Sequence, residues 1–405
     1  MGSVLGLNGR LDAVNFFLAD VRGGLGPYVS VYLLTAANWD QATIGAVLTA
    51  SGLIGICAHA PIGALIDATH SKRALLVIAA LMLAVCAIAI ERAPIWPVVF
   101  AADITMAILG AVFAPTVASL TLGLMQPEQF SARIGRNAVF DRIGNVLIAA
   151  VAGFFGWWLG QRSVFWLVPV FALPAIAAIL SIPASAIDHV RARALVADAP
   201  SEGAVAGVRL LMRYRAFMAL CLLVAAFHFA NASLLPLVSQ KLALAHPGAE
   251  AAFVSACVLT AQFAAIPTGW FVARRAADFS HWKMLFFGCL LLPLRALIFA
   301  MADDPVVLVA AQVLDGLGAG LFDTLMPLLL ADLMRGAGHY SLSRGVAGFV
   351  QGVAGSLSNV VSGVLVVAFG YATAFLALAA VSLVAVAIAS ALALRVPALR
   401  QATVL

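Results

Sequence analysis

Two opposite charges lie close together in an otherwise apolar segment near the start of the chain. Asp20 and Arg22 occur within FFLADVRGGLGPY, residues 16 to 28. A charge inside a membrane is costly, so such side chains usually face other helices, pair with one another and mark a pathway for protons, ions or substrates. Asp20 is therefore a candidate proton carrier, and Arg22 is a candidate counter-charge for an anionic group.

The two side chains point in different directions if the segment is helical. At about 100° per residue, Arg22 lies about 200° around the helix from Asp20. Asp20 shares its face with Gly23, Gly24 and Pro27. We expect Asp20 to lie on a face suited to close packing or substrate approach, and Arg22 to reach a neighbouring helix.

A polar stripe with four-residue steps occurs further along the chain. Asn137, Asp141 and Asn145 recur at this spacing, and Arg142 follows Asp141 directly. One interpretation is that Asn137, Asp141 and Arg142 line a transport cavity. The other is a structural ion pair, Asp20 with Arg142 or Asp141 with Arg22, and the sequence leaves both open.

The second half of the chain has its own isolated charges. Arg295 is the predicted partner of Asp315, in a structural ion pair. Asp323 lies eight residues after Asp315, about 80° around the same helix, and is the better candidate for binding and releasing a proton. His228 is either a second proton site or a packing residue, and Asn231 nearby supplies a neutral donor and acceptor.

A stripe of small and polar residues follows near residues 344 to 359. Gly348, Gly352 and Gly355 favour close helix packing, because small residues let helices approach. Gln351 and Asn359 lie in the same stripe. They are candidates for hydrogen bonds to a substrate near the membrane midplane, where transporters with internal repeats bind their substrates.

The composition shows that these residues belong to segments that lie in a membrane. Hydrophobic residues make up 64% of the 405 residues, only 10% are charged, and the mean hydropathy is +1.07. A soluble domain of this length would have too little polar surface. The five cysteines lie in apolar runs without metal-ligand spacing, so we expect inert thiols, no metal site and no cofactor.

Apolar segments of about 20 residues, the length that crosses a bilayer, recur along the whole chain. They predict an all-α integral membrane protein with twelve transmembrane helices in two pseudo-symmetric six-helix bundles. The predicted parts are residues 1–183 for the first bundle, 184–215 for a polar cytoplasmic linker and 216–405 for the second bundle. The predicted spans are 13–34, 42–66, 74–92, 96–122, 136–159, 163–183, 216–240, 251–272, 284–302, 306–330, 344–369 and 373–395.

The basic residues predict the orientation, because cytoplasmic loops are rich in Lys and Arg. With both termini in the cytoplasm, seventeen basic residues fall in cytoplasmic segments and only Arg92, Arg162 and Lys241 on the other side. The distribution explains the net charge of +5, so we expect no nucleic acid as a partner. Two cytoplasmic termini, together with the absence of an organellar transit pattern, predict a multi-pass protein of a bacterial inner membrane.

The two halves share sequence features that indicate an internal repeat. DITMAILGAVFAP, residues 103 to 115, and DGLGAGLFDTLMP, residues 315 to 327, have the same twelve-residue step from Asp to Pro. Duplication of a six-helix unit is the expected origin.

One loop carries a family resemblance. GALIDATHSKRALL, residues 63 to 76, resembles the signature between the second and third helices of the major facilitator superfamily (MFS). The resemblance implies that Gly63 allows close helix contact, that Asp67 meets helix ends and basic partners, and that Lys72 and Arg73 form the basic cluster of a cytoplasmic gate. His70 and Ser71 depart from this pattern. The resemblance therefore identifies the superfamily but no subfamily.

The predicted function is secondary transport of a small organic solute by alternating access, coupled to protons. Export is favoured because Asp20 in the first helix resembles the arrangement in proton-coupled multidrug exporters of the superfamily. Uptake of an organic anion or metal chelate, with Arg22 and Arg142 as counter-charges, is the alternative. A membrane-embedded enzyme or a scaffold is more remote, because no catalytic motif and no phosphate-binding loop occur. The expected partners are a small-molecule substrate, protons and the lipid bilayer. We expect the protein to be a monomer.

Overall fold

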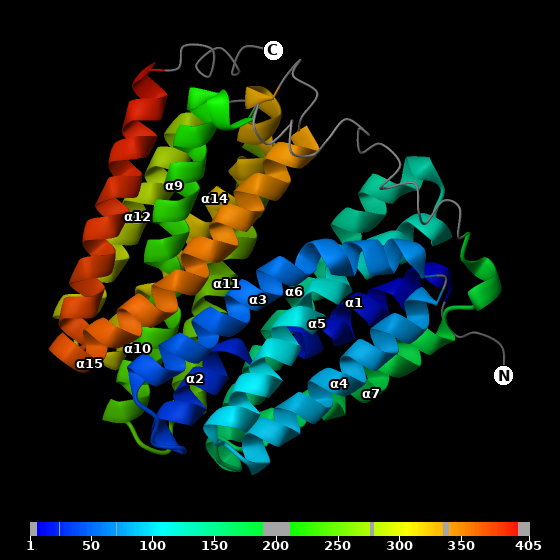
Figure 1. The fold of residues 1–405 in the computed structure, drawn as a ribbon, viewed down its shortest axis with the longest axis horizontal. Helices are drawn as coiled ribbons and strands as arrows, with labels where there is room; N and C mark the ends of the chain where they lie inside the picture. The colour runs from blue at the N-terminus through cyan, green and yellow to red at the C-terminus, as the bar shows by residue number, and fades with distance from the viewer. Residues whose placement is uncertain are drawn as a thin grey trace. The chain divides into compact units, whose positions relative to one another are not determined.

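The protein is described by a computed structural model that covers residues 6–23, 25–69, 71–188, 211–275, 279–334 and 340–395 (Figure 1). All regular secondary structure in these residues is helical. The first part of the chain contains α1 (Leu7–Gly23), α2 (Gly26–Thr35), α3 (Gln41–Ala68), α4 (Lys72–Arg92), α5 (Trp96–Leu124), α6 (Pro127–Trp158), α7 (Ser163–Ser181) and the short 3-10 helix η1 (Ala184–Ala186).

The second part of the chain is helical in the same way. Its helices are α9 (Arg215–Ala232), α10 (Leu234–Ala245), α11 (Glu250–Arg275), α12 (His281–Met301), α13 (Pro305–Ala310), α14 (Gln312–Leu333) and α15 (Tyr340–Arg395). Gly370 has φ 83° and ψ 170°, so α15 consists of two helices that meet at this residue. Of the predicted linker, residues 189–210 lie outside the described part of the chain.

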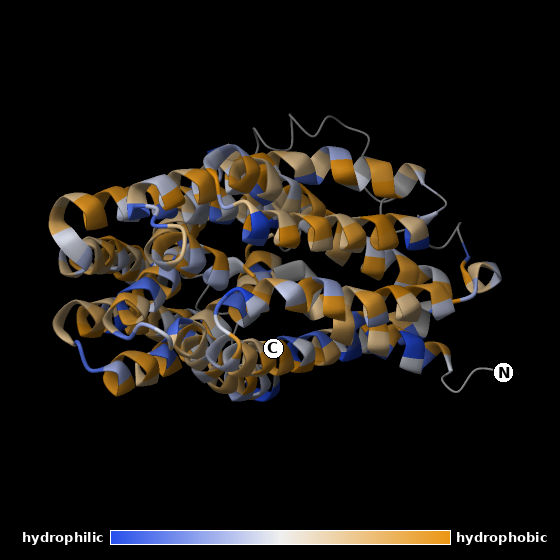
Figure 2. Ribbon diagram, turned by 90° about the horizontal axis from the view of Figure 1, so that it is seen from below, coloured by the Kyte–Doolittle hydropathy of each residue, from blue (hydrophilic) through white to orange (hydrophobic). Residues whose placement is uncertain are grey.

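Ten helical segments in the described residues are long and apolar enough to cross a membrane. One of them, Leu342–Leu392, contains both helices of α15, and α1 with α2 accounts for the predicted first span. The prediction of an all-helical membrane protein with twelve spans is therefore confirmed. Figure 2 shows that hydrophobic residues predominate along these helices.

Three helix boundaries differ from the predicted spans for local reasons. The first span is broken before α2, where Gly26 and Pro27 form the first turn and the missing N–H of proline is tolerated. The seventh span is divided at Ser233 between α9 and α10. The helix of the fifth span, α6, begins at Pro127 rather than residue 136, because a polar helical segment precedes the apolar stretch of Arg133–Trp158.

The entry to α3 shows how a polar side chain fixes a helix end. The Asp40 carboxylate accepts hydrogen bonds from the Thr43 hydroxyl at 2.6 Å and from the Thr43 backbone N–H at 2.8 Å. These bonds satisfy a donor that the helix itself leaves unpaired. They also hold the pKa of Asp40 below its usual value.

The helices form two compact units. One consists of Met1–Asn38, Ala50–Ala199 and His246–Ser255, and the other of Trp39–Thr49, Pro200–Ala245 and Ala256–Leu405. In the first unit α1 packs on α6 and α7, and α4 packs on α5 and α7; in the second, α15 packs on α9 and α12, and α12 packs on α14.

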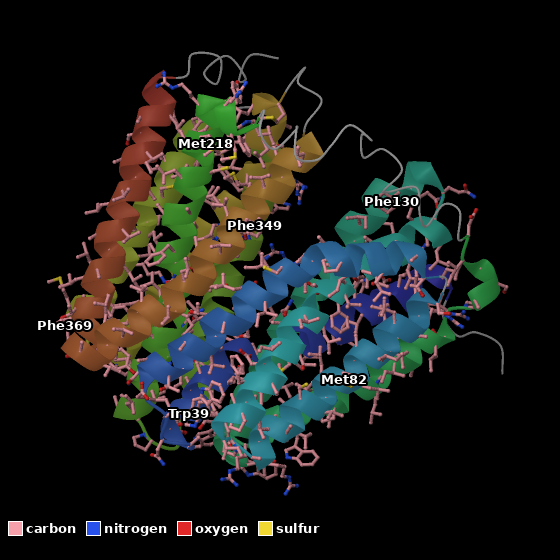
Figure 3. The ribbon with its side chains drawn as sticks, viewed as in Figure 1. Trp39, Met82, Phe130, Met218, Phe349 and Phe369 are labelled. Atoms are coloured by element: carbon pink, nitrogen blue, oxygen red, sulfur yellow. The ribbon has the colours of Figure 1, made fainter. Side chains whose placement is uncertain are left out.

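Many apolar side chains remain exposed on the helices. Met82, Phe349 and Phe369 have 43%, 53% and 67% of their surface exposed (Figure 3). In a water-soluble protein such a surface would promote aggregation. In a membrane it faces an apolar solvent, which agrees with the many apolar spans.

Candidate functional site

The second unit contains a fully buried cation. Arg295 of α12 is 1% exposed, and its Nη1 atom donates to the Asp315 carboxylate at 2.5 Å and to the Asn231 side-chain oxygen at 2.8 Å. Its Nη2 atom donates to the Gln312 side-chain oxygen at 2.7 Å. The predicted Arg295–Asp315 pair is present, and Asn231 joins it. The cluster links α9, α12 and α14.

Two donors of this cluster are not used within the described residues. The Nε atom of Arg295 and the Nε2 atom of Gln312 are buried and have no hydrogen-bond partner there. An unsatisfied buried donor costs about 1–3 kcal/mol. The cluster thus neutralises its charge but retains donors for an additional acceptor.

A cavity of about 290 Å³ lies between α14 and α15 of the same unit. Three of its lining residues have polar side chains: Asp323 of α14, and Arg344 and Gln351 of α15. Apolar residues and Gly348 complete the wall. The sequence singled out Asp323 and Gln351 as site residues, whereas Arg344, at the start of the predicted eleventh span, was not among them. The cavity brings an acid, a base and an amide to one place, and we take it as the candidate site.

His228 of α9 lies next to this wall. Its ring meets that of Phe322 edge-on, with centroids 5.0 Å apart, and Phe322 lines the cavity. The Nε2 atom of His228 is buried and has no hydrogen-bond partner in the described part of the chain. His228 therefore packs behind an aromatic residue of the cavity wall and is not itself a lining residue.

Asn359 lies elsewhere in the second unit. Its side-chain oxygen accepts a hydrogen bond from the Ser233 hydroxyl at 3.3 Å. Its backbone lies so close to Gly45 of α3 that a Cβ atom at Gly45 would clash with the Asn359 carbonyl. Asn359 thus lies at a tight helix contact and is not among the lining residues of the α14–α15 cavity.

The first unit has a different charged cluster, near the beginning of α1. The Asp12 carboxylate accepts hydrogen bonds from Arg133 at 2.6 Å and from Arg136 at 2.6 Å, both on α6. Arg133 also donates to the Asn137 side-chain oxygen at 2.8 Å, and Asn137 donates to Thr121 at 3.0 Å. Asn137, a predicted lining residue, is thus buried in a network that ties α1, α5 and α6 together.

The other predicted site residues of the first unit are Asp20, Arg22, Asp141 and Arg142. The side chains of Asp20 and Arg22 lie outside the described residues, although their backbone belongs to α1. The Asp141 carbonyl accepts a hydrogen bond from the Asn145 side chain at 2.9 Å, and Arg142 is exposed on α6. The two ion pairs suggested for these residues, Asp20 with Arg142 and Asp141 with Arg22, stay predictions.

Asp103 is a further acidic residue that was not among the predicted site residues. The Ser51 hydroxyl of α3 donates a hydrogen bond to the Asp103 carboxylate of α5. Asp103 is the first residue of the repeated segment, in which Asp315 is its counterpart. The repeat was the signal that could have identified it. Asp315 is paired with a guanidinium, whereas Asp103 is bound to a neutral hydroxyl.

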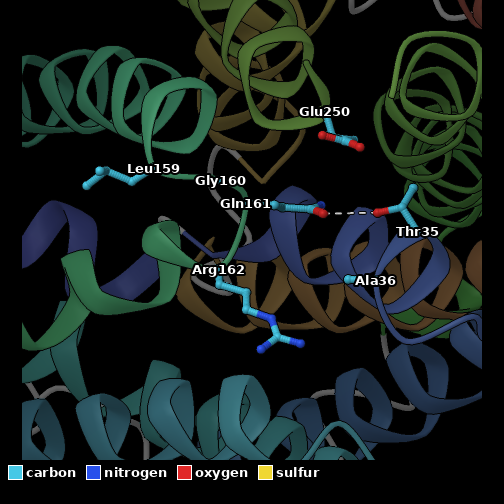
Figure 4. Close-up of a pocket in the computed structure, with 7 residues that line it drawn as sticks. All are labelled: Thr35, Ala36, Leu159, Gly160, Gln161, Arg162 and Glu250. Atoms are coloured by element: carbon cyan, nitrogen blue, oxygen red, sulfur yellow. Dashed lines mark hydrogen bonds between the residues drawn. The ribbon is translucent and has the colours of Figure 1, made fainter. Parts of the chain in front are cut away.

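A polar pocket of about 290 Å³ lies at one corner of the first unit, between the end of α2, the α6–α7 turn and the first turn of α11 (Figure 4). Thr35 donates to the Gln161 side-chain oxygen at 3.0 Å. Arg162 and Glu250 lie on opposite sides of Gln161 (Figure 4). No predicted site residue lines this pocket, and it opens at the helix ends rather than within the spans.

Comparison with known proteins gives the family. A family model described as the Major Facilitator Superfamily matches residues 11–303, which is most of the chain. The chain belongs to the major facilitator superfamily. Two relatives, each called an uncharacterised MFS-type transporter, come from Mycobacterium tuberculosis strains CDC 1551 and H37Rv. Both are 39% identical over 377 residues, covering 92% of this chain and 89% of theirs.

Solved structures agree with the superfamily fold. A structure of a variant of the nucleoside transporter NupG has a TM-score of 0.80 at 15% identity, covering 96% of this chain and all of that one. A POT family transporter in complex with a thioalcohol-conjugated peptide has a TM-score of 0.75 at 14% identity, covering 95% and 96%. The chain is thus a multi-pass secondary transporter of MFS fold.

The loop signature of the superfamily is only partly described. Lys72 is buried, and its Nζ atom donates to the Ile66 carbonyl at 2.8 Å, which fixes the end of α3. The side chain of Asp67 lies outside the described residues. The close helix contact expected at Gly63 is not found, because no described atom lies within 4 Å of a Cβ atom built there. Arg73 binds the end of α7 and is considered below.

The glycines of the stripe in α15 also differ from expectation. A Cβ atom at Gly348 would meet nothing within 4 Å among the described atoms, and one at Gly355 would make ordinary contact with Ala232 at 3.5 Å. Gly348 lines the cavity instead. The space beside Gly348 therefore belongs to the candidate site and not to a helix–helix contact.

Proposed function

We propose that this MFS transporter exports a small organic solute in exchange for protons, by alternating access. The observation that carries the proposal is the cavity between α14 and α15, with Asp323, Arg344 and Gln351 in its wall. In this proposal Asp323 carries the proton, Gln351 hydrogen-bonds the substrate and Arg344 supplies a counter-charge. Ionisable groups inside membrane spans commonly have such roles.

The surroundings of the two acids support Asp323 rather than Asp315 as the proton carrier. Asp315 is held by the buried guanidinium of Arg295 at 2.5 Å. Asp315 is therefore fixed as the counter-charge of the buried Arg295, and separating such a pair is strongly unfavourable. Asp323 borders a cavity, where a proton or a substrate can reach it. The export direction rests on the acidic residue in the first helix, Asp20, as the resemblance implies.

Uptake of an organic anion or a metal chelate is the second candidate. Arg344 lines the cavity, so a guanidinium is available to an anionic substrate. In that case Arg22 and Arg142 serve as further counter-charges in the first bundle. Replacing Arg344 would then abolish binding, while replacing Asp323 would alter only proton coupling.

The remaining assignments are part of the same proposal. The bundles comprise residues 1–183 and 216–405 with a linker of residues 184–215, and the protein works as a monomer in the inner membrane. The distribution of Lys and Arg supports cytoplasmic termini. Asp20, Asp141, His228 and Asn231 are kept as secondary pathway residues.

Proton flux in proteoliposomes tests the proposal. A pH-sensitive dye is enclosed, and drug-like compounds and organic anions are added outside to wild type, Asp323→Asn and Asp303→Asn. The control residue Asp303 has a 93% exposed side chain that pairs with Lys241 at 2.8 Å. We expect substrate-dependent proton flux in wild type and Asp303→Asn, and none in Asp323→Asn. Equal flux in all three would exclude Asp323 as the carrier and move attention to Asp103.

A further inference from the structure

A second cavity, in the first unit, has one polar end and one apolar wall. It has a volume of about 320 Å³ and lies between the start of α4 and the end of α7 with the turn that follows. Ser71 and Arg73 lie at its polar end, and Val77, Ile78 and Leu180 form its apolar wall. We call it the α4–α7 groove. None of its residues lines the α14–α15 cavity.

Basic side chains gather at the polar end of the groove. The Nη1 atom of Arg73 donates to the backbone carbonyls of Ile182 and Leu180. The Nη1 atom of Arg10 donates to the intervening carbonyl of Ser181 at 2.6 Å. Two guanidiniums thus bind the last carbonyls of α7, where the helix dipole favours cations. A guanidinium has five N–H donors, so these carbonyls use only part of the Arg73 donor set.

The apolar wall continues into the outer surface of the same two helices. On α4, Ile78, Leu81 and Val85 are 57%, 49% and 61% exposed, and their spacing of three and four residues places them on one face. On α7, Leu173 and Leu180 are 68% and 56% exposed. Met82 of α4 (Figure 3), four residues after Ile78, is 43% exposed on the same face. The groove therefore leads from a basic end directly onto a surface that hydrocarbon chains cover.

This combination selects one kind of occupant. A soluble anion would be recognised by Arg73 but would gain nothing from Val77, Ile78 and the exposed face beyond them. A zwitterionic lipid would fill the apolar wall but would bring its own cation to Arg73. An anionic headgroup on two acyl chains matches both ends, since basic pockets between spans at the membrane surface bind such headgroups.

The geometry points to the α4–α7 groove as a binding site for one anionic glycerophospholipid, with its phosphate at Arg73 and its acyl chains along α4 and α7. This site is separate from the proposed transport site and does not depend on the direction or coupling of transport. The expected consequence is that the purified protein retains anionic lipid selectively. Arg10 contributes charge to the headgroup region.

Native mass spectrometry of the detergent-purified protein tests the site. Dioleoylphosphatidylglycerol and dioleoylphosphatidylcholine are titrated separately onto wild type, Arg73→Gln and Ala74→Trp. Ala74 lines the groove without charge, so the tryptophan fills the space and leaves Arg73 unchanged. Arg274→Gln is the matched control, because Arg274 is an exposed basic residue at the end of α11 that stacks on Trp270, centroid distance 4.3 Å.

Wild type is expected to bind the anionic lipid more tightly than the zwitterionic one. Arg73→Gln should weaken anionic-lipid binding about fivefold, the effect of one basic residue at an anionic surface, and Ala74→Trp should weaken it at least as much. Arg274→Gln should bind as wild type does, and excess inorganic phosphate should not displace the lipid. Equal binding of both lipids to wild type, or unchanged binding in Ala74→Trp, would overturn the inference. Displacement by phosphate would show a soluble-anion site instead.

Discussion

At the scale of single residues, the two units deal with buried charge in different ways. Arg295 has one carboxylate and two neutral oxygens around it, so the second unit holds a compensated pair within its spans. In the first unit one carboxylate, Asp12, binds two arginines near the start of α1. Charges fixed in these networks are poorly suited to move with a substrate. Asp103 and Asp323 belong to neither network, and Asp323 lines the α14–α15 cavity.

The Arg295 cluster gives a stability prediction. Arg295→Gln leaves Asp315 without its cation, and breaking a buried pair in this way costs about 3–5 kcal/mol. The double variant Arg295→Gln/Asp315→Asn should recover a large part of this loss, because no isolated charge remains. The measurement is the thermal unfolding midpoint of the purified protein in detergent. If the double variant is no more stable than Arg295→Gln, the two residues do not act as a pair.

At the scale of elements, close helix approach occurs at particular glycines. A Cβ atom at Gly144 of α6 would clash with the Phe16 carbonyl of α1 and lie 2.8 Å from the Ala19 Cβ atom. The carbonyl belongs to the backbone and cannot turn away as a flexible side chain can. Gly144 therefore sets the distance between α1 and α6, which carry Asp20 and Asp141.

Substitution of this glycine tests the contact. Gly144→Ala should destabilise the protein by about 1–3 kcal/mol, as overpacking generally does. Gly110 of α5 is the matched control in the same unit, since no described atom lies within 4 Å of a Cβ atom there. Gly110→Ala should leave stability unchanged or raise it slightly, because alanine favours helix. Similar unfolding midpoints for both variants would contradict the role of Gly144.

At the scale of the whole molecule, the chain is a set of apolar helices whose ends are marked by polar turns. The apolar surface is accommodated by lipid, and the positive charges lie mainly on one side of the predicted spans. In the proposed topology, this distribution places the loops rich in Lys and Arg in the cytoplasm. The α4–α7 groove then binds its proposed lipid on the cytoplasmic side.

Labelling of single cysteines tests the orientation. In a variant without native cysteines, Pro247→Cys, before α11, and Gln129→Cys, in the first turn of α6, are treated with a membrane-impermeant maleimide. Both positions are exposed. Pro247→Cys should react in intact cells, and Gln129→Cys only after the membrane is permeabilised. The opposite pattern would reverse the proposed topology.

The sequence by itself determined the class of protein, the number of spans and one pair of residues. Runs of about 20 apolar residues can cross a bilayer only as helices, because the backbone must satisfy its own hydrogen bonds there, and the twelve spans followed from this. The Arg295–Asp315 pair followed because a membrane cation needs a nearby counter-charge.

Only the tertiary structure decided which polar residues meet. Asn137 joined Arg133 in a buried network, Gly348 and Arg344 became cavity wall, and Asp103 bound Ser51. The order of residues along a helix gives the face on which each lies, but not which helix covers that face. That choice depends on how the helices pack, and in this protein it separates the charges that hold helices together from those that border a cavity.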